Sequence, residues 1–201
     1  MSSRILFDSD GAGRSRVLGM VDVSGEKNTH SLQLEQQITE LFNQLSKPVY
    51  RYGLSLGLPA SAADEITQET FLRLFQHLAR KGREDNLRGW IFRVAHNLAM
   101  DFITANRHFA DGSIDDWPLL LDSLQSRSLG PEEALLEKER MRRVHDAMKL
   151  LSSQQRECLA LRSEGFRYRE IAEIMEISVH TVAEHLQRAM QKLSRELSES
   201  I

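Results

Sequence analysis

Cysteine is almost absent from this chain, which contains a single one, Cys158, among 201 residues. A lone thiol excludes an internal disulfide and a zinc site built from several cysteines. Leucine and alanine surround Cys158 in the sequence, which favours a buried structural thiol. No apolar run approaches the roughly 20 residues that a membrane-spanning helix needs. The N-terminus lacks the pattern of a signal peptide, so we expect a cytoplasmic protein without membrane insertion.

Recognisable catalytic motifs are also lacking. The seven histidines are scattered, and none forms an HExxH motif or pairs with cysteine at metal-ligand spacing. There is no G-x-S-x-G motif, no P-loop and no dinucleotide-binding fingerprint. We therefore expect no enzymatic activity, no cofactor and no metal site. Because the net charge is -3, any nucleic-acid contact must come from local basic patches or from a larger partner.

The segment from 151 to 193 has the pattern of two helices, a short turn and a third helix. Ser152 and Gln155 form a capping box that begins the first helix, and Gly165 is placed to end it. Ser178 is a good N-cap for the last helix. Apolar or small residues stand where they would lock a helix-turn-helix: Ala172, Ile177 and Val182. Such a motif presents the start of its last helix to a major groove.

Spacing alone also fits an ordinary helical hairpin in an all-α domain. One local feature supports that alternative, because the turn position that often carries glycine is Glu176. If the turn keeps its usual positive φ, a side chain there costs about 1 kcal/mol.

Upstream, the glycine-rich and serine-rich residues 1–30 indicate a mobile tail. Apolar residues recur at helical spacing from Leu34. A capping box of Ser61 with Asp64 predicts a second helix to about Ala79 with an acidic first turn. Its apolar residues cover more than one face, which indicates deep burial or a partner on the second side.

A third helix is predicted over residues 87–102, with an apolar face that includes Trp90, which we expect in the core, and a polar face that includes His96. Basic residues outnumber acidic ones between Arg73 and Arg107, which makes a local basic patch in an acidic chain. The basic residues are Arg73, Arg80, Lys81, Arg83, Arg88, Arg93 and Arg107, and the acids are Glu84, Asp85 and Asp101.

Residues 111–130 are rich in aspartate, glycine and serine, a composition typical of a linker. Pro131 suits the first turn of a new helix, which we expect to pack on the helix-turn-helix through Leu135, Leu136, Val144, Ala147, Met148 and Leu151. We expect an all-α fold of two small helical domains joined by a flexible acidic linker. The expected boundaries are a mobile tail over 1–30, a first domain over 31–110, a linker over 111–131 and a second domain over 132–201.

Three stretches resemble one protein family in the same order: DEITQETFLRLF from Asp64, LRGWIFRVAHNLAMDF from Leu87, and LSSQQRECLALRSEGFRYREIAEIMEISVHTVAEHLQRAM from Leu151. They are similar to the extracytoplasmic-function (ECF) group of the sigma-70 family, the bacterial RNA polymerase sigma factors. The resemblance covers about Leu34 to Leu197. It implies binding to core RNA polymerase and to promoter DNA, with an anti-sigma factor as a further expected partner.

The resemblance also implies a role for each helix. The second helix would bind the polymerase largest subunit through Asp64, Glu65, Gln68, Glu69 and Leu72. The third would open the promoter and read its minus-ten element through Arg88, Arg93, Asn97, Asp101 and Arg107. The last would read the minus-thirty-five element through His180, Thr181, Glu184, Gln187 and Arg188. Ala183 and Glu184 depart from the family's more basic pattern; a glutamate accepts from cytosine but repels phosphate.

Two other classes of function fit parts of the sequence. A stand-alone regulator of the LuxR kind would explain SVHTVAEHL but leaves residues 64–102 without a role. A regulatory decoy that binds proteins rather than DNA would suit Glu184 and the net negative charge, but the basic patch opposes it. The linker is either a segment that runs through the polymerase or a plain solvated tether.

Overall fold

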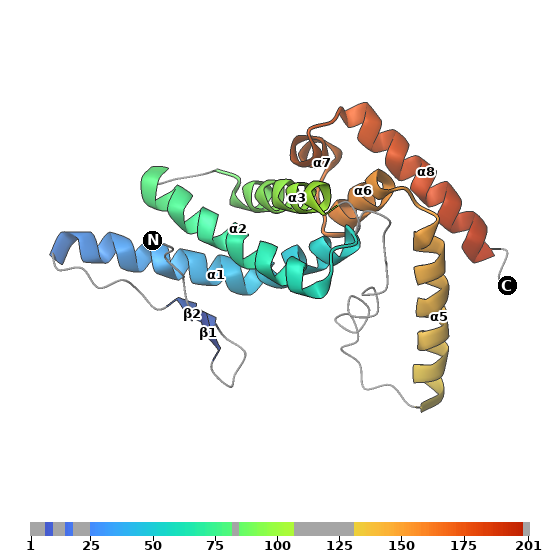
Figure 1. Ribbon diagram of the computed structural model, residues 1–201, viewed down its shortest axis with the longest axis horizontal. Coiled ribbons are helices and arrows are strands. Elements are labelled where there is room, and N and C mark those ends of the chain that lie inside the picture. The colour runs from blue at the N-terminus through green and yellow to red at the C-terminus, as the bar shows by residue number, and fades with distance from the viewer. Residues whose placement is uncertain (1–6, 10–14, 18–24, 82–84, 107–130, 199–201) are drawn as a thin grey trace.

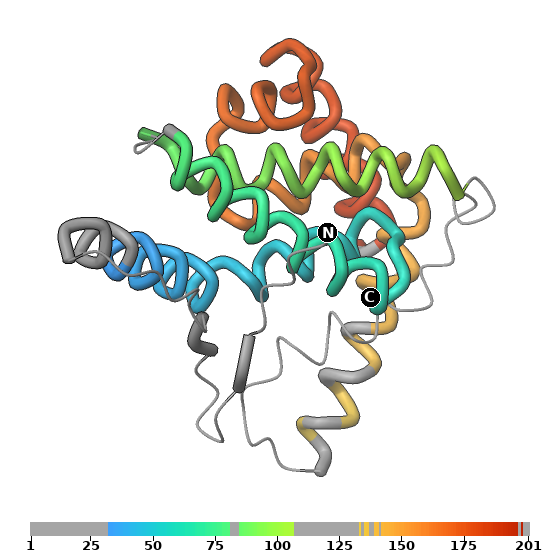
Figure 2. The backbone as a smooth tube through the Cα atoms, turned by 60° about the vertical axis from the view of Figure 1, so that its left-hand side comes forward, coloured from blue at the N-terminus to red at the C-terminus, as the bar shows by residue number. Residues whose placement is uncertain are grey.

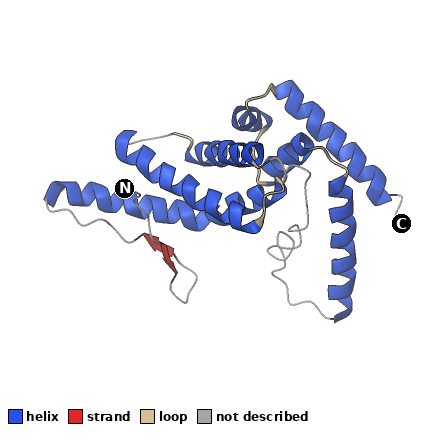
Figure 3. Cartoon of the chain, viewed as in Figure 1, coloured by secondary structure: helices blue, strands red, loops and turns tan. Residues whose placement is uncertain are grey.

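The computed structural model describes residues 7–9, 15–17, 25–81, 85–106 and 131–198 (Figure 1). Its fold is all-α, as predicted, and a short antiparallel pair of strands precedes the helices (Figure 3). The elements are β1 (Phe7–Ser9), β2 (Ser15–Val17), α1 (Gly25–Ser55), α2 (Ala60–Lys81), α3 (Leu87–Ala105), α5 (Pro131–Lys149), α6 (Ser153–Ser163), α7 (Tyr168–Met175) and α8 (Val179–Ser198).

The N-terminal residues differ from the mobile tail that we expected over 1–30. The structure pairs Phe7 with Val17 and Ser9 with Ser15 in the two strands, and α1 already begins at Gly25. The predicted acidic linker falls almost entirely on residues 107–130, which are not among those that the structure describes.

The helices α1, α2 and α3 pack around a shared hydrophobic core. Ile38, Val49 and Tyr52 of α1 are buried against Phe71 of α2 and Ile91 of α3. The second helix begins one residue earlier than the predicted cap at Ser61. The carbonyl oxygen of Pro59 accepts from the amide of Ala63 at 3.0 Å, so Ser61 lies inside the helix and Asp64 in its second turn rather than its first.

The C-terminal helices start and end where local chemistry predicts. The Ser152 hydroxyl accepts from the Gln155 amide at 3.3 Å, and the Gln155 side chain accepts from the Ser152 amide at 3.1 Å. Gly165 has φ +89°, and the next amide, that of Phe166, donates to the Leu161 carbonyl at 3.2 Å. This is the Schellman arrangement that ends a helix at glycine.

The helix α5 follows the prediction only in its second half. It begins at Pro131, and its residues Val144 and Met148 pack with Leu151 and with Ala189 of α8. Leu135 and Leu136 were wrongly expected in the same contact, because their side chains are 68% and 70% exposed. Figure 1 shows the reason: α5 diverges from α8 toward its start, so only its last turns reach that helix.

The turn between α7 and α8 keeps the positive φ expected of it. Glu176 has φ 55° and ψ 38°, and its amide donates to the Ala172 carbonyl. We expect Glu176→Gly to raise the free energy of unfolding by up to about 1 kcal/mol, because glycine adopts this conformation without steric cost. Urea denaturation measures the change. Glu173→Gly, inside α7, is the control and should destabilise by about 1 kcal/mol; equal destabilisation by both would contradict the prediction.

The two halves of the chain share one core rather than standing apart. Cys158 and Leu161 of α6, Phe166 and Ile171 belong to the same buried cluster as the residues of α1, α2 and α3. α7 packs against α3 and α6 packs against α1, and both views show these C-terminal helices next to the N-terminal ones (Figures 1 and 2). The sequence predicted two helical domains, but it did not predict that they would pack together.

Candidate nucleic-acid interface

The last helix has the surface of a recognition helix. The Ser178 hydroxyl accepts from the Thr181 amide at 3.0 Å and so caps the start of α8. Val182, Leu186 and Ala189 are buried, which turns the opposite face of the helix to solvent. Of the residues predicted for the minus-thirty-five element, His180, Gln187 and Arg188 are exposed, and Thr181 and Glu184 are partly buried. The structure therefore gathers the whole set on the first turns of one helix.

Glu184 stands between the two basic side chains of this set. One carboxylate oxygen lies 3.4 Å from Nε2 of His180, and the other lies 3.3 Å from Nη2 of Arg188. These contacts run along the helix at spacings of four residues. Because the carboxylate offsets the charge of Arg188, this helix presents less positive charge to phosphates than its basic residues alone would.

The minus-ten set is divided by the structure. Arg93, Asn97 and Asp101 are exposed and follow one another at intervals of four residues along α3, so they form a single polar strip. Arg107 lies beyond the last described residue of this segment. Arg88 is exposed too, but it is turned away from the strip and toward the C-terminal half of the chain.

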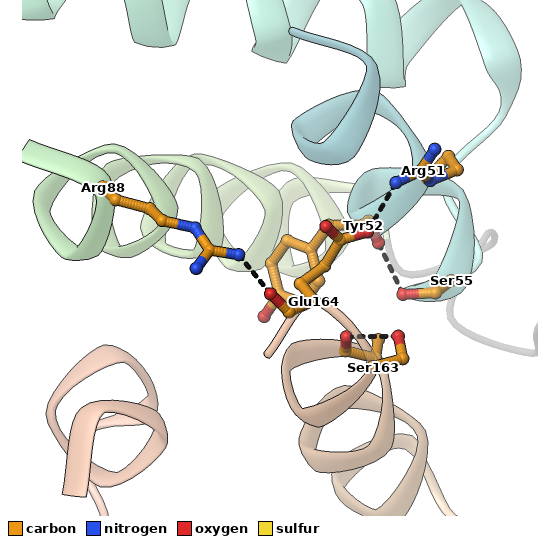
Figure 4. Close-up of polar contacts among 7 residues, drawn as sticks. Arg51, Tyr52, Ser55, Arg88, Ser163 and Glu164 are labelled. Carbon is orange, nitrogen blue, oxygen red and sulfur yellow. Dashed lines mark hydrogen bonds and ion pairs between the residues drawn. The ribbon is translucent and has the colours of Figure 1, made fainter. Parts of the chain in front are cut away.

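Arg88 is held by the loop between α6 and α7. Its Nη2 donates to the carbonyl oxygen of Glu164, and its guanidinium lies 4.5 Å from the centre of the Phe166 ring. Arg51 of α1 reaches the same loop, with its Nη2 2.9 Å from Oε1 of Glu164 (Figure 4). The Phe166 ring meets Phe92 of α3 edge to face, with 4.8 Å between ring centres.

Sequence reasoning missed Arg51, Glu164 and Phe166 as a group. One signal was available: an apolar residue directly after a helix-ending glycine commonly packs back on the protein, and Phe166 follows Gly165. Nothing in the sequence, however, indicates that Phe166 would meet α3, because the two segments are separated by a linker.

A buried polar pair lies behind this contact. The Tyr52 hydroxyl is 2.8 Å from Nδ1 of His96. His96 was wrongly placed on the outer polar face of its helix, because its side chain is only 7% exposed. Burial lowers the pKa of His96, against a smaller opposing effect of Glu176. Burial also raises the pKa of the Tyr52 hydroxyl, with Glu157 adding to the effect.

Two more buried ionisable groups, both on α6, lie close to Tyr52 of α1. Burial raises the pKa of Glu157 to about 7, although the neighbouring Arg156 opposes the rise. Cys158 is fully buried, as predicted, and burial together with Glu157 raises its thiol pKa to about 12. The boundary between the two halves therefore favours neutral forms of its ionisable groups.

Arg93 lines a small cleft between α3 and α7. Trp90 was expected in the core, but its side chain is only half-buried. The centres of the Trp90 and His77 rings lie 4.7 Å apart. The cleft thus joins an arginine and an aromatic ring from α3 to two carboxylates from α7. Its lining residues are Asn86, Gly89, Trp90, Arg93, Glu170, Glu173 and Ile174.

The predicted polymerase-binding residues lie along one side of α2. Asp64, Glu65 and Gln68 are exposed, and the Gln68 side chain donates to Asp64 at 2.9 Å. Glu69 pairs with Arg73 at 2.8 Å. Leu72 is half-buried, whereas the inward residues of the same helix are fully covered. The arrangement is an acidic strip with a leucine at its edge.

The described residues contain neither a metal-binding cluster nor a membrane-spanning helix. In that part of the chain, no group of three or more histidine, cysteine, aspartate or glutamate side chains is placed to hold a metal ion. Of the helices that the structure describes there, none combines the length and the apolar character needed to cross a bilayer.

Two family models match the chain, one over α1 to α3 and the other over the C-terminal helices. Residues 41–109 match the family model of sigma-70 region 2, and residues 141–193 match that of sigma-70 region 4. The chain is 28% identical to the probable RNA polymerase sigma factor RfaY of Xanthomonas campestris pv. campestris, over 81% of this chain and 41% of that protein. It thus spans less than half of RfaY.

A second relative is matched over more of its length. The ECF RNA polymerase sigma factor EcfG of Rhodopseudomonas palustris is 30% identical over 71% of this chain and 75% of that protein. Among solved structures, the fold is similar to the sigma factor RpoE of Bartonella quintana, crystallised with the anti-sigma factor NepR. That match has a TM-score of 0.56 and 22% identity, and it covers 81% of this chain and 97% of that one.

Proposed function

Because this chain belongs to the sigma-70 family, we propose that it is an RNA polymerase sigma factor of the ECF group. In this role it binds core polymerase and directs the enzyme to promoters, where DNA-templated transcription begins. The observation that carries the proposal is the order of the two family regions along the chain, each on helices with an outward polar strip. We assign region 2 to residues 31–110, the linker to 111–131 and region 4 to 132–201.

The three strips suit three different contacts. The acidic strip of α2, with the half-buried Leu72 at its edge, suits a protein partner, because its charges can complement an oppositely charged protein surface while the leucine adds an apolar contact. We assign it to core polymerase. The strip of Arg93, Asn97 and Asp101 on α3 offers a cation and base-edge groups for an unpaired minus-ten strand. The exposed start of α8 suits the major groove at the minus-thirty-five element.

The remaining roles follow from this assignment. Polymerase supplies the chemistry, so the chain needs no catalytic residues, and its place of action is the cytoplasm. An anti-sigma factor is a fitting partner, since the structural relative from Bartonella quintana was crystallised with one. The alternative of a stand-alone LuxR-type regulator is not supported, because it leaves the region 2 match over residues 41–109 unexplained.

Transcription in a purified system tests the proposal. With core polymerase and a library of promoter fragments, start sites should appear only when the protein is added. Asn97→Ala and Arg188→Ala should each reduce specific transcripts roughly tenfold or more, because a base contact contributes about 1–3 kcal/mol. Binding to core polymerase should persist in both variants.

Gln191→Ala is the matched control, because Gln191 is exposed on the same helix as Arg188 but lies outside the proposed contact set. It should leave transcription unchanged. Absence of core binding by the unmodified protein, together with retention of specific duplexes by the protein alone, would replace the sigma-factor proposal with the stand-alone regulator.

A further inference from the structure

The first turns of α8 carry a carboxylate on the face that the proposed function gives to the major groove. Val182 and Leu186 are buried, and Glu184 lies two residues from each along the sequence, which places it on the opposite side of the helix. Residues 179–188 contain no other acid. A carboxylate on this face repels the phosphates of DNA. The contact to which it contributes favourably is one with a base edge.

We propose that Glu184 selects a cytosine in the minus-thirty-five element, no more than one base pair from a guanine that Arg188 contacts. The carboxylate accepts from the N4 amino group of cytosine, and the guanidinium donates to O6 and N7 of guanine. This inference rests on the proposed function, because it specifies the DNA sequence that the same helix reads.

The two side chains already stand at the spacing of neighbouring bases. Nη2 of Arg188 lies 3.3 Å from Oε2 of Glu184, and successive bases along a strand are about 3.4 Å apart. Both side chains project from one face of the helix, since residues four apart are neighbours on its surface. The acceptor and the donor can therefore reach adjacent base edges together, while the guanidinium offsets the charge of the carboxylate.

His180 contacts the other oxygen of the same carboxylate. Its Nε2 lies 3.4 Å from Oε1 of Glu184, so the carboxylate has a partner on each side along the helix. A side chain that is already oriented loses less rotamer freedom when it binds. This arrangement favours a defined contact with a base over a mobile surface charge.

The hydroxyl groups on the first turn are engaged in the helix cap. The Ser178 hydroxyl accepts from the Thr181 amide and lies 2.7 Å from the Thr181 hydroxyl. Ala183, beside Glu184 in the sequence, has no polar side-chain group. Glu184 therefore supplies a strong acceptor that the capping hydroxyls do not.

The chemistry of a carboxylate determines which base it selects. When ionised, it accepts hydrogen bonds but donates none. In the major groove, cytosine offers a donor, adenine offers a donor beside an acceptor, and the polar groups of guanine and thymine are acceptors. Glu184 therefore prefers cytosine to adenine and rejects guanine and thymine. An amide at the same position reverses the first preference, because it pairs with both N6 and N7 of adenine.

Transcription from a pool of promoters tests the inference with the full chain and core polymerase. The minus-thirty-five region is randomised, the rest of each promoter is constant, and a barcode in each transcript identifies its promoter. Glu184→Gln should change the preferred base at one position from cytosine to adenine, with the ratio of the two shifting roughly tenfold. Glu184→Ala should remove the preference there. Arg188→Gln should remove a preference for guanine within one base pair of that position.

Glu196→Gln is the matched control, because it makes the same exchange at an exposed residue near the other end of α8. It lies about 18 Å from Glu184 along the helix axis, at about 1.5 Å per residue, so every base preference should stay unchanged. If Glu184→Gln shifts no preference, or raises transcription from all promoters alike, the carboxylate acts only by repelling phosphates and the inference is overturned. A guanine that depends on Arg188 but lies further away would also overturn it.

Selection of duplexes from a randomised pool by the full chain alone separates the two proposals. If core polymerase gives no specific transcripts, but the selected duplexes change from cytosine to adenine in Glu184→Gln, the base readout stands and the sigma-factor assignment falls. If transcription is specific but Glu184→Gln keeps the original preferences, the assignment stands and the base readout falls. If neither the transcripts nor the selected duplexes show a preference for cytosine, the base readout falls as well.

Discussion

Replacement of Phe166 by alanine is expected to lower the free energy of unfolding by about 3–5 kcal/mol, the usual cost of removing a buried aromatic ring. Phe166 is 1% exposed and meets the Phe92 ring at 4.8 Å between centres. Its position after Gly165 fixes the ring to the end of α6, so little rearrangement is available to fill the cavity. Urea denaturation followed by circular dichroism measures the loss.

A nearby aromatic residue provides the control for this change. Tyr168 is 41% exposed. The centre of its ring lies 5.8 Å from the guanidinium of Arg162. Tyr168→Ala should cost about 1 kcal/mol or less. A double-mutant cycle between Phe92→Ala and Phe166→Ala should give a coupling of about 0.5–1.5 kcal/mol. Equal small losses for Phe166 and Tyr168, with no coupling, would mean that the loop does not pack on α3.

The helix ends of the C-terminal half were predictable because each depends on a few neighbouring residues. The capping box of Ser152 with Gln155 needs only that spacing, and both of its hydrogen bonds are present. Gly165 and Glu176 were recognised from turn chemistry, and both have positive φ. The fold class and the outward placement of the α8 set follow from helical periodicity in the same way.

Periodicity could not predict that one face of α3 packs against region 4. A pattern tells which residues share a face, but not whether a polar face will meet solvent or another domain. His96 looked solvent-exposed beside Asn97, yet it is buried on Tyr52. Arg88 looked like a free cation, yet it binds the loop at Glu164. The burial of His96 depends on the packing of α1 against α3, and the engagement of Arg88 depends on a contact with a segment that lies beyond residues 107–130.

The same limit explains the misplacement of Leu135 and Leu136. Their spacing continues the apolar stripe of Val144 and Met148, so periodicity alone extends the contact along all of α5. The structure ends the contact where α5 and α8 diverge, and the two leucines are left exposed. A stripe in sequence therefore gives the direction of a contact, while the crossing of the helices sets its length.

The ionisable groups at the boundary between the regions make stability depend on pH. The pKa of Glu157 is about 7 in the folded chain, against an ordinary value of 4.5. Between these values the folded chain binds more protons than the unfolded chain, so its stability falls as the pH rises through this window and levels off above about pH 7. The full loss is about 3 kcal/mol.

Glu157→Gln should remove this loss, because the amide resembles the protonated carboxyl but does not ionise. The variant and the unmodified protein should be nearly equal in stability at about pH 5, and the variant should be more stable by about 2–3 kcal/mol at about pH 8. His96 acts in the opposite direction: its lowered pKa costs stability as the pH falls below its ordinary value. Since His96 is present in both proteins, its effect cancels in their difference.

Urea denaturation of both proteins at the two pH values gives that difference directly. A difference that stays constant with pH would show that Glu157 ionises as in water, which would be incompatible with its burial beside Tyr52 and Cys158.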